Sequence, residues 1–255
     1  MTVSKLYELL NERIPPSLSC EWDNDGVMCL PEPDREVKRI LVSLDITDAV
    51  VDRAIDGGYD VLVSHHPLLF HAVKHMTVTD PVTRKAIRLC RAGVASLSFH
   101  TRLDALAGGV NDVLAELLNI KDALPFGDEG MGRVGTLAEE MTPEAFAALV
   151  ADKLHAPTVT LADAGKPIRR VAVLGGAGGD DMPLAFAAGA DAYVTGEASH
   201  HRLLDAPEMG MTLVVAGHYH TEQPVCAVLG RMLQDMLPMA HVDVIDHYPI
   251  QTIIR

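Results

Sequence analysis

Three short apolar segments of the chain each lead into side chains that can bind metal ions. Residues 61–66 end in two adjacent histidines, while residues 94–100 and 212–218 each end in a histidine with a carboxylate four residues later. The side chains concerned are His65, His66, His100, Asp104, His218 and Glu222. Mixed imidazole and carboxylate ligands favour zinc, iron, manganese or cobalt over magnesium or calcium. The pattern predicts a metal site; the alternative is that each histidine is only structural or solvated.

The number of donors favours two metal ions over one. Three imidazoles and two carboxylates, from His65, His66, Asp104, His218 and Glu222, exceed the three or four protein ligands of a single divalent ion. Adjacent side chains in a strand point to opposite faces, but a proline at position 67 breaks the strand, so each histidine of the pair can reach a different ion. We therefore expect a pair of divalent ions, with one carboxylate as the bridge.

Several other residues have two interpretations. His200 and His201 follow another predicted strand, and one of them is expected to line the same site. Asp45 follows residues 39–44 and either supports a ligand or caps the next helix. The other histidines are interpreted as structural or solvated: His71, His75, His155, His220, His241 and His247. The single tryptophan, Trp22, is interpreted as a core residue.

The glycine-rich segment LGGAGGDD (174–181) follows a predicted strand and could form either a tight turn or a phosphate-binding loop. Its N–H groups could face a phosphate, but its spacing fits neither the dinucleotide fingerprint nor the phosphate-binding loop of nucleoside triphosphatases. A tight turn is the expected structure.

Strands and helices alternate along the chain in the order that positions these residues at strand ends. Strands are predicted at 39–47, 61–66, 94–100, 133–137, 158–162, 169–176, 192–196, 212–218 and 242–245. Helices are predicted at the N-terminus and at 49–58, 79–93, 109–120, 142–154, 182–189 and 222–237. The order predicts an α/β fold with mixed, largely parallel sheets flanked by helices. A break at 123–133 predicts two lobes, 1–125 and 126–255, with a last strand able to return to the first lobe.

Composition excludes several classes of partner. The 255 residues carry a formal net charge of −14 without a Lys/Arg stripe, so a nucleic acid is not expected to bind. No segment has the roughly 20 apolar residues of a membrane span, and the N-terminus is a charged amphipathic segment without the pattern of a signal peptide. The four cysteines are widely spaced and are expected to be small core residues of a cytoplasmic protein.

Seven segments resemble, in order, the Nif-three-like dinuclear metal-centre family, whose members often carry the name GTP cyclohydrolase I type II homologue. They are WDNDGV (22–27), SLDIT (43–47), VSHHPLLF (63–70), HTRLD (100–104), GGVND (108–112), DAYVTGE (191–197) and AGHYHTE (216–222). The resemblance covers nearly the whole chain, without the middle insertion domain of longer members. It implies two α/β lobes and a toroidal homohexamer, a trimer of dimers, with sites that face an internal cavity.

The resemblance also assigns site residues. Two metals are implied at the positions of His65, His66, Asp104, His218 and Glu222, with the glutamate as bridge. His100 and His201 match further histidines near the family's site, although the segment after TGE reads Ser-His-His where a Lys-Tyr-His run is usual.

Two functions remain open from the sequence. One is a hydrolase in which two metals activate water against a small anionic, nucleotide-like or phosphate-bearing molecule, with His100 or His201 moving the proton. The other is a non-enzymatic protein that binds or delivers metal or acts as a regulatory partner.

Overall fold

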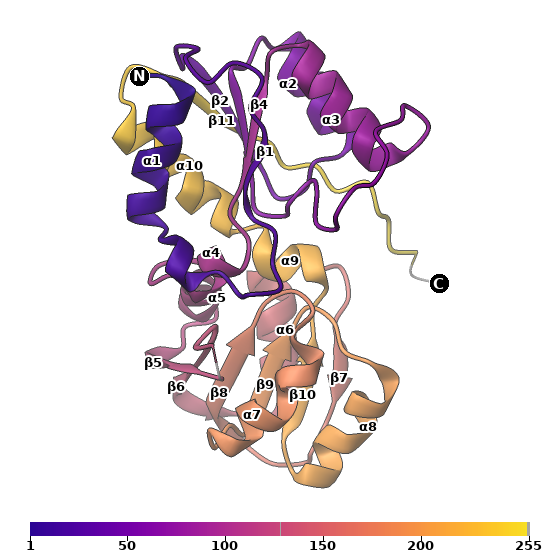
Figure 1. The fold of residues 1–255 in the computed structure, drawn as a ribbon. Coiled ribbons are helices and arrows are strands. Elements are labelled where there is room, and N and C mark those ends of the chain that lie inside the picture. Colours follow the sequence, from indigo (N-terminus) through magenta and orange to yellow (C-terminus); the bar gives the residue numbers. More distant parts are fainter. Residues whose placement is uncertain (128, 254–255) are drawn as a thin grey trace. The chain divides into compact units, whose positions relative to one another are not determined.

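The structure, a computed structural model, describes residues 1–127 and 129–253 and divides into two units (Figure 1). Unit 1 comprises Met1–Leu103 and Cys226–His247, and unit 2 comprises Asp104–Val225 with the segment that begins at Tyr248. The division differs from the predicted one at residue 125. The last strand lies in unit 1, because it pairs with the strand that begins at Arg39.

Unit 1 is built on a five-stranded sheet in the order β1-β4-β3-β2-β11. The strands are β1 (Gly26–Cys29), β2 (Arg39–Ser43), β3 (Val61–Ser64), β4 (Ala95–Ser98) and β11 (His241–Val244). The predicted parallel pairing of β2, β3 and β4 is confirmed, and only β1 runs antiparallel to its neighbour. Strand β1 was not predicted, because its four residues lie between two polar segments.

Helices cover both faces of the unit 1 sheet (Figure 1). They are α1 (Val3–Arg13), α2 (Asp48–Asp56), α3 (Pro81–Arg91) and α10 (Val225–Met236), with short helices η1 (Pro16–Leu18) and α4 (Thr101–Ala105). Helices α2 and α3 share one apolar cluster with β2 and β3, while α1 and α10 lie on the other side of the sheet. Side chains of Thr2, Thr47 and Asp80 accept hydrogen bonds from backbone N–H groups in the first turns of α1, α2 and α3.

A buried arginine joins three parts of unit 1 near His100. The Arg102 guanidinium donates from Nε to Asp25 Oδ2 (2.8 Å), and from one terminal nitrogen to Asn11 Oδ1 (2.8 Å) and the Ile14 carbonyl (3.1 Å). These bonds connect the first turn after β4 with the end of α1 and with the segment before β1. The backbone that follows His100 is thereby tied to α1 and to the segment before β1.

Unit 2 is built on a six-stranded sheet in the order β5-β6-β8-β9-β10-β7. The strands are β5 (Lys121–Phe126), β6 (Gly132–Met141), β7 (Thr160–Ala162), β8 (Ile168–Leu174), β9 (Ala192–Thr195) and β10 (Thr212–Val215). Only β8, β9 and β10 pair in parallel, so the expectation of a largely parallel sheet is wrong for this unit. The predicted break at 123–133 contains the end of β5 and the start of β6, two antiparallel neighbours joined by a short connection.

The unit 2 sheet separates two apolar clusters. Its helices are α5 (Val110–Leu117), α6 (Pro143–Lys153), α7 (Met182–Ala187), α8 (His200–Met209) and α9 (His218–Glu222), with the short helix η2 (Gly178–Asp181). In β8, Val171 and Val173 join the cluster formed with α5 and α6, while Ala172 and Leu174 join the one formed with α7. This alternation is the period of two that a strand imposes. Helix α8 was not predicted.

The exposure of Trp22 and of the cysteines differs in part from what the sequence predicted. Trp22 is 59% exposed, so its interpretation as a core residue is wrong. Cys20, Cys29 and Cys226 are buried as expected, and Cys90 is exposed. Within the described part of the chain, no helix has the length and apolar character to cross a bilayer.

Candidate metal centre

The ends of β3 and β4 bring three histidines of unit 1 together. His65 and His66 follow β3 directly, and His100 follows β4 after one intervening residue, so all three lie at the carboxyl edge of parallel strands. One ring nitrogen from each histidine lies within 4.8 Å of the others. The ring centroids of His65 and His66 are 4.9 Å apart, so the chain turn at the strand end places both on one side. We call these three residues the unit 1 histidine group.

Each ring of this group has its Nδ1 atom directed at an oxygen. His65 Nδ1 lies 3.0 Å from the Phe99 carbonyl, His66 Nδ1 lies 2.8 Å from Asp45 Oδ1, and His100 Nδ1 lies 2.9 Å from Asp23 Oδ1. A carbonyl or an ionised carboxylate only accepts hydrogen bonds, so Nδ1 carries the proton and Nε2 has the lone pair. Histidine ligands of metals show the same arrangement, with the second nitrogen bonded to a carbonyl or carboxylate.

Asp23 is the most strongly held of these acceptors. Its carboxylate is fully buried and accepts hydrogen bonds from His100 Nδ1 and from the Thr101 amide and hydroxyl. Burial by itself would raise the pKa of Asp23, but these hydrogen bonds outweigh it and hold the pKa well below its usual value. Asp23 is therefore an ionised acceptor that fixes the orientation of the His100 ring.

Removing the charge of Asp23 is expected to weaken metal binding. In Asp23→Asn the amide no longer offers two carboxylate oxygens, so the His100 ring loses its fixed orientation. The His100 ring lies edge-to-face against the rings of His65 and His66, with centroids 5.3 Å and 5.7 Å apart, so its displacement disturbs both of these candidate ligands. Metal affinity should fall by about tenfold, the lower end of the effect of losing a supporting residue. Titration of the metal-free protein with Zn²⁺ measures this. Glu21→Gln, an equal charge change at an exposed neighbouring position, is the control, and equal affinities for the two variants would contradict the role of Asp23.

Unit 2 contributes a histidine and a glutamate from one short helix. Helix α9 begins at His218, after two residues that follow the end of β10, and ends at Glu222. The sequence predicted a strand up to residue 218 and a helix only from 222, so both residues lie in a helix that was not predicted, while the expectation that they face each other at i, i+4 spacing is confirmed. His218 Nε2 lies 3.0 Å from Glu222 Oε2, and Glu222 is only 4% exposed. His218 Nδ1 lies 2.8 Å from Glu197 Oε1. We call His218 and Glu222 the unit 2 pair.

The surroundings of His218 fit a bound cation. Both of its ring nitrogens face carboxylate oxygens, and a neutral imidazole can donate a hydrogen bond from only one nitrogen. A proton held by His218 or by Glu222, or a metal ion between them, satisfies the second contact. The imidazole and carboxylate donors of both units suit zinc, iron, manganese or cobalt.

The turn after β8 keeps space open beside the unit 2 pair. The Gly175 amide donates to Asn111 Oδ1 and the Gly176 amide donates to Thr221 Oγ1, so side chains of α5 and α9 occupy both N–H groups. The segment predicted as a tight turn continues into the short helix η2. Gly176 has a φ of +65°, and a Cβ there would overlap Glu222 Oε1 and lie 3.2 Å from His218 Nε2. A side chain at this position would displace the candidate ligands.

Gly176→Ala is therefore expected to weaken both the fold and metal binding. The left-handed backbone alone costs alanine about 1–2 kcal/mol. Gly165→Ala isolates that cost, because Gly165 has a φ of +67° and open space around its Cβ. Urea denaturation and Zn²⁺ titration of both variants should show reduced metal affinity for Gly176→Ala alone. The same affinity in both variants would contradict the packing of Gly176 against the unit 2 pair.

The remaining predicted site residues all belong to unit 2. Asp104 lies in α4, the helix that begins directly after His100, and its carbonyl accepts a hydrogen bond from Asn111 Nδ2. A carboxylate oxygen of Asp104 lies within 4.8 Å of a carboxylate oxygen of Glu222, so Asp104 adds a second carboxylate beside the unit 2 pair. His200 and His201 begin α8 and are exposed, and His201 Nδ1 lies 3.1 Å from Ser199 Oγ. The assignment of His201 as a proton-transfer residue stays a prediction.

Sequence reasoning missed two of the supporting carboxylates. Glu197 lies two residues after β9, so the rule that located the ligands at strand ends would also have found it. Asp23 precedes the unpredicted strand β1, and no local pattern connects it with His100, 77 residues away. Asp45 was one of two alternatives, and the hydrogen bond to His66 supports the ligand-supporting role, since Thr47 caps α2.

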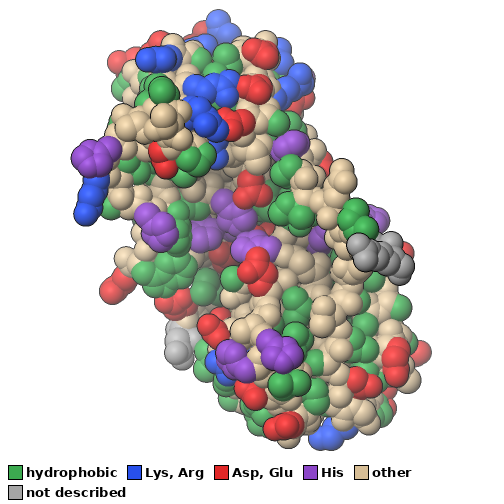
Figure 2. Space-filling view, turned by 90° about the vertical axis from the view of Figure 1, so that its right-hand side faces the viewer, with side chains coloured by type: hydrophobic (Ala, Val, Ile, Leu, Met, Phe, Trp, Pro, Cys, Tyr) green, Lys and Arg blue, Asp and Glu red, His purple; other side chains and the backbone are tan. Residues whose placement is uncertain are grey.

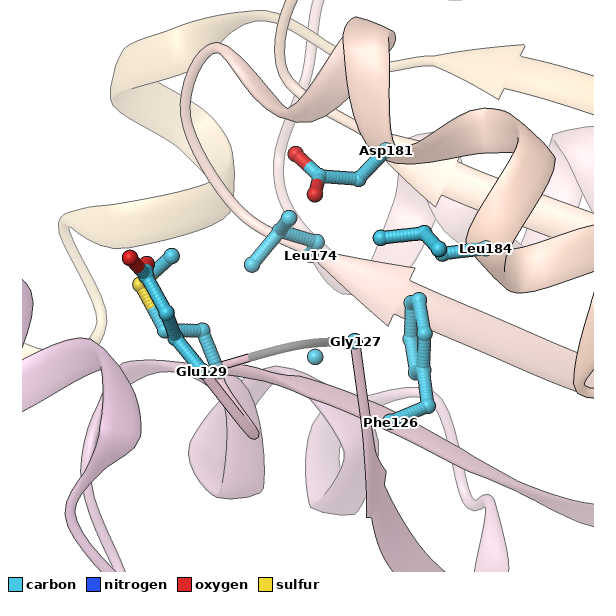
Figure 3. A pocket seen from close by; sticks show the side chains of 8 residues that line it. Phe126, Gly127, Glu129, Leu174, Asp181 and Leu184 are labelled. Atoms are coloured by element: carbon cyan, nitrogen blue, oxygen red, sulfur yellow. The ribbon is translucent and has the colours of Figure 1, made fainter.

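A pocket in unit 2 and the charged side chains on the surface are separate from the unit 1 histidine group and the unit 2 pair. A pocket of about 220 Å³ in unit 2 is lined by apolar side chains and by the carboxylates of Glu129 and Asp181 (Figure 3). No residue of the unit 2 pair lines it. On the face drawn in Figure 2, acidic side chains are spread widely and several Lys and Arg side chains gather in the upper part of the view.

Comparison with known proteins shows the family. A family model described as Duf34/NIF3 (NGG1p interacting factor 3) matches residues 1–249. A Clostridium perfringens protein named GTP cyclohydrolase 1 type 2 homolog is 31% identical over 244 residues, which cover 93% of each chain. A solved Staphylococcus aureus structure superposes with a TM-score of 0.90 at 27% identity, covering 99% of each chain. Reduced HcgD from Methanocaldococcus jannaschii superposes with a TM-score of 0.86 at 29% identity, covering 97% of this chain and 98% of that one.

These matches extend over nearly the whole chain and include both units, as the order of the histidine- and glycine-containing segments indicated. The chain belongs to the Duf34/NIF3 family.

Proposed function

We propose that this protein is a dinuclear metal-dependent hydrolase that acts on a nucleotide-like or phosphate-bearing small molecule. Its ligands are His65, His66, Asp104, His218 and Glu222, which together hold two divalent ions, with Glu222 as the bridge. Zinc, iron, manganese and cobalt are the metals that suit these donors. The relatives named GTP cyclohydrolase 1 type 2 homolog support a nucleotide as the substrate.

One observation carries the proposal: four imidazoles in two units are oriented alike. His65, His66, His100 and His218 each direct Nδ1 at a carbonyl or carboxylate oxygen at 2.8–3.0 Å. Histidines that serve only packing or solvation have no need for a common tautomer. With Nδ1 directed at an acceptor, the lone pair of Nε2 is left to bind a metal ion or, in His100, to accept a proton.

The chain's own residues would orient the reactants and move protons. Two bound divalent ions supply Lewis acidity and activate water for attack. We assign to His100, which is held by Asp23, the role of taking up or returning a proton, and His201 is the second candidate for this role. The local positive charge would also allow an anionic substrate to approach a protein with a net charge of −14.

Metal analysis and activity assays test the proposal together. Purified protein should contain two ions per chain, and anomalous scattering should identify the element and place it at the five ligands. Hydrolysis of GTP or of members of a phosphoester panel should stop when a chelator removes the metal and return when the metal is restored. Two bound ions without turnover on any substrate would contradict the hydrolase and favour a metal-holding or metal-delivering protein.

We further propose that the chain assembles as a homohexamer, a trimer of dimers. The chain mass is 27.5 kDa, so light scattering of the purified protein should give about six times that value. A monomer or a dimer at micromolar concentration would contradict the assembly, without bearing on the ligand assignment.

A further inference from the structure

Two aromatic side chains lie exposed beside the unit 1 histidine group. Trp22 is 59% exposed and Phe70 is 39% exposed. Large aromatic side chains are usually mostly buried, and exposed ones that adjoin each other often mark a binding site. Trp22 precedes Asp23, and Phe70 follows His66 by four residues, so both belong to the segments that supply the candidate metal centre.

The two rings and His100 form a compact group. The ring centroids of Trp22 and Phe70 are 6.2 Å apart, and those of Trp22 and Phe70 lie 6.3 Å and 5.9 Å from that of His100. All three pairs are edge-to-face, with interplanar angles of 73°, 80° and 87°. Such contacts fix the rings relative to one another while much of each aromatic surface stays open to solvent.

The segments that carry the rings are tied to the rest of unit 1. The Asn24 side-chain amide donates to the Leu69 carbonyl, which connects the Trp22 segment with the Phe70 segment. Asp23 is bound to His100 and Thr101, and the Leu69 amide donates to the Met28 sulfur at 3.5 Å. The rings are thus held before any ligand binds, which reduces the entropy lost on binding.

We propose that Trp22 and Phe70 form a stacking platform for the planar base of a purine nucleotide. This inference rests on the proposed function and adds the residues that would recognise its substrate. A nucleotide has an aromatic base and an anionic phosphate, and unit 1 offers an aromatic surface directly beside a histidine group suited to hold cations. Because every purine presents a π-face, stacking alone predicts comparable affinity for guanine and adenine nucleotides.

The single tryptophan makes the platform directly observable. Fluorescence of the metal-loaded protein reports Trp22 alone, since the chain has one tryptophan. GTP and ATP should quench this fluorescence in a saturable way, whereas inorganic triphosphate, which lacks a base, should leave it unchanged. Binding of triphosphate itself is followed by calorimetry.

Variants separate stacking from other causes. Trp22→Ala and Phe70→Ala should each weaken GTP binding by about tenfold or more, without changing triphosphate affinity or metal content. Trp22→Phe should retain most of the affinity, because a ring remains. Phe186→Ala is the matched control, since Phe186 is a 42% exposed phenylalanine of unit 2, and it should bind GTP normally.

Several outcomes would overturn the platform: no binding of GTP or ATP, binding without quenching, or wild-type affinity in Trp22→Ala. The last two would leave the exposed rings as a contact for a protein partner. Failure of the platform is distinguishable from failure of the hydrolase. Quenching without turnover supports the platform and contradicts the proposed catalysis, whereas chelator-sensitive turnover without quenching does the reverse.

Discussion

Replacing Glu222 by glutamine is expected to lower the metal affinity of the protein by more than about 100-fold, because even a supporting residue behind a ligand accounts for about 10–100-fold. The Glu222 carboxylate is 4% exposed and lies 3.0 Å from His218 Nε2. Glutamine keeps the shape of the side chain but removes its charge and turns one acceptor oxygen into an N–H donor. If Glu222 bridges two ions, both should be lost together.

Metal content after dialysis and Zn²⁺ titration measure the effect. Glu208→Gln, at an exposed position of α8, gives the same change of charge away from the ligands and should retain both ions. A Glu222→Gln protein that keeps two ions per chain would show that Glu222 is no ligand. Loss of a single ion would argue that the glutamate binds one metal and does not bridge.

Replacing Arg102 by methionine is expected to reduce the free energy of unfolding by about 3–5 kcal/mol, the usual effect of removing one partner of a buried ion pair. Arg102 is 1% exposed and pairs with the nearly buried Asp25, and it also donates to Asn11 and Ile14. Methionine fills a similar space and retains apolar contact with Phe99, over whose ring the guanidinium lies at 4.6 Å. The loss then reflects the uncompensated Asp25 charge and the missing hydrogen bonds.

The midpoint of urea denaturation measures this effect. Lys5→Met removes an ion pair with Glu8 in which both side chains are more than half exposed, so its midpoint should change little. Equal midpoints for the two variants would mean that the Arg102 network contributes no more than a surface pair. Because Arg102 follows His100 by two residues, its variant should also lose metal affinity, which Lys5→Met should not.

The local pattern of the chain was sufficient to predict most elements and the histidine and carboxylate positions. Strands β2 and β3 have apolar, β-branched sequences because parallel strands are buried on both faces, and β4, which carries two serines, is buried as well. Helices α2 and α3 begin within two residues of the predicted starts at 49 and 79, although Thr47 and not Asp45 caps α2. The proximity of His218 and Glu222 was expected from their i, i+4 spacing, although the short helix that joins them was predicted to begin only at Glu222.

Elements without a distinctive pattern were missed or misread. Strand β1 has only four residues, too few for an alternation of apolar and polar side chains to show. Strand β5 is mostly exposed, and its apolar and polar residues do not alternate. The predicted division at residue 125 relied on a glycine-rich break that proved to be a connection between paired strands. Long-range pairing of β11 with β2, about 200 residues apart, determines the division, and no local signal contains it.

What the sequence determined by itself was the family, the alternation of strands and helices, and the donor side chains at the strand ends, because each depends on residue type and short-range spacing. What only the tertiary structure decided was how those donors are oriented. Asp23 holds His100 across 77 residues, and Glu197 holds His218 across 21. The exposure of Trp22 was likewise a tertiary outcome. A hydrogen bond between distant segments forms only when the sheets have placed both partners. The residues next to either partner in the sequence therefore do not predict it.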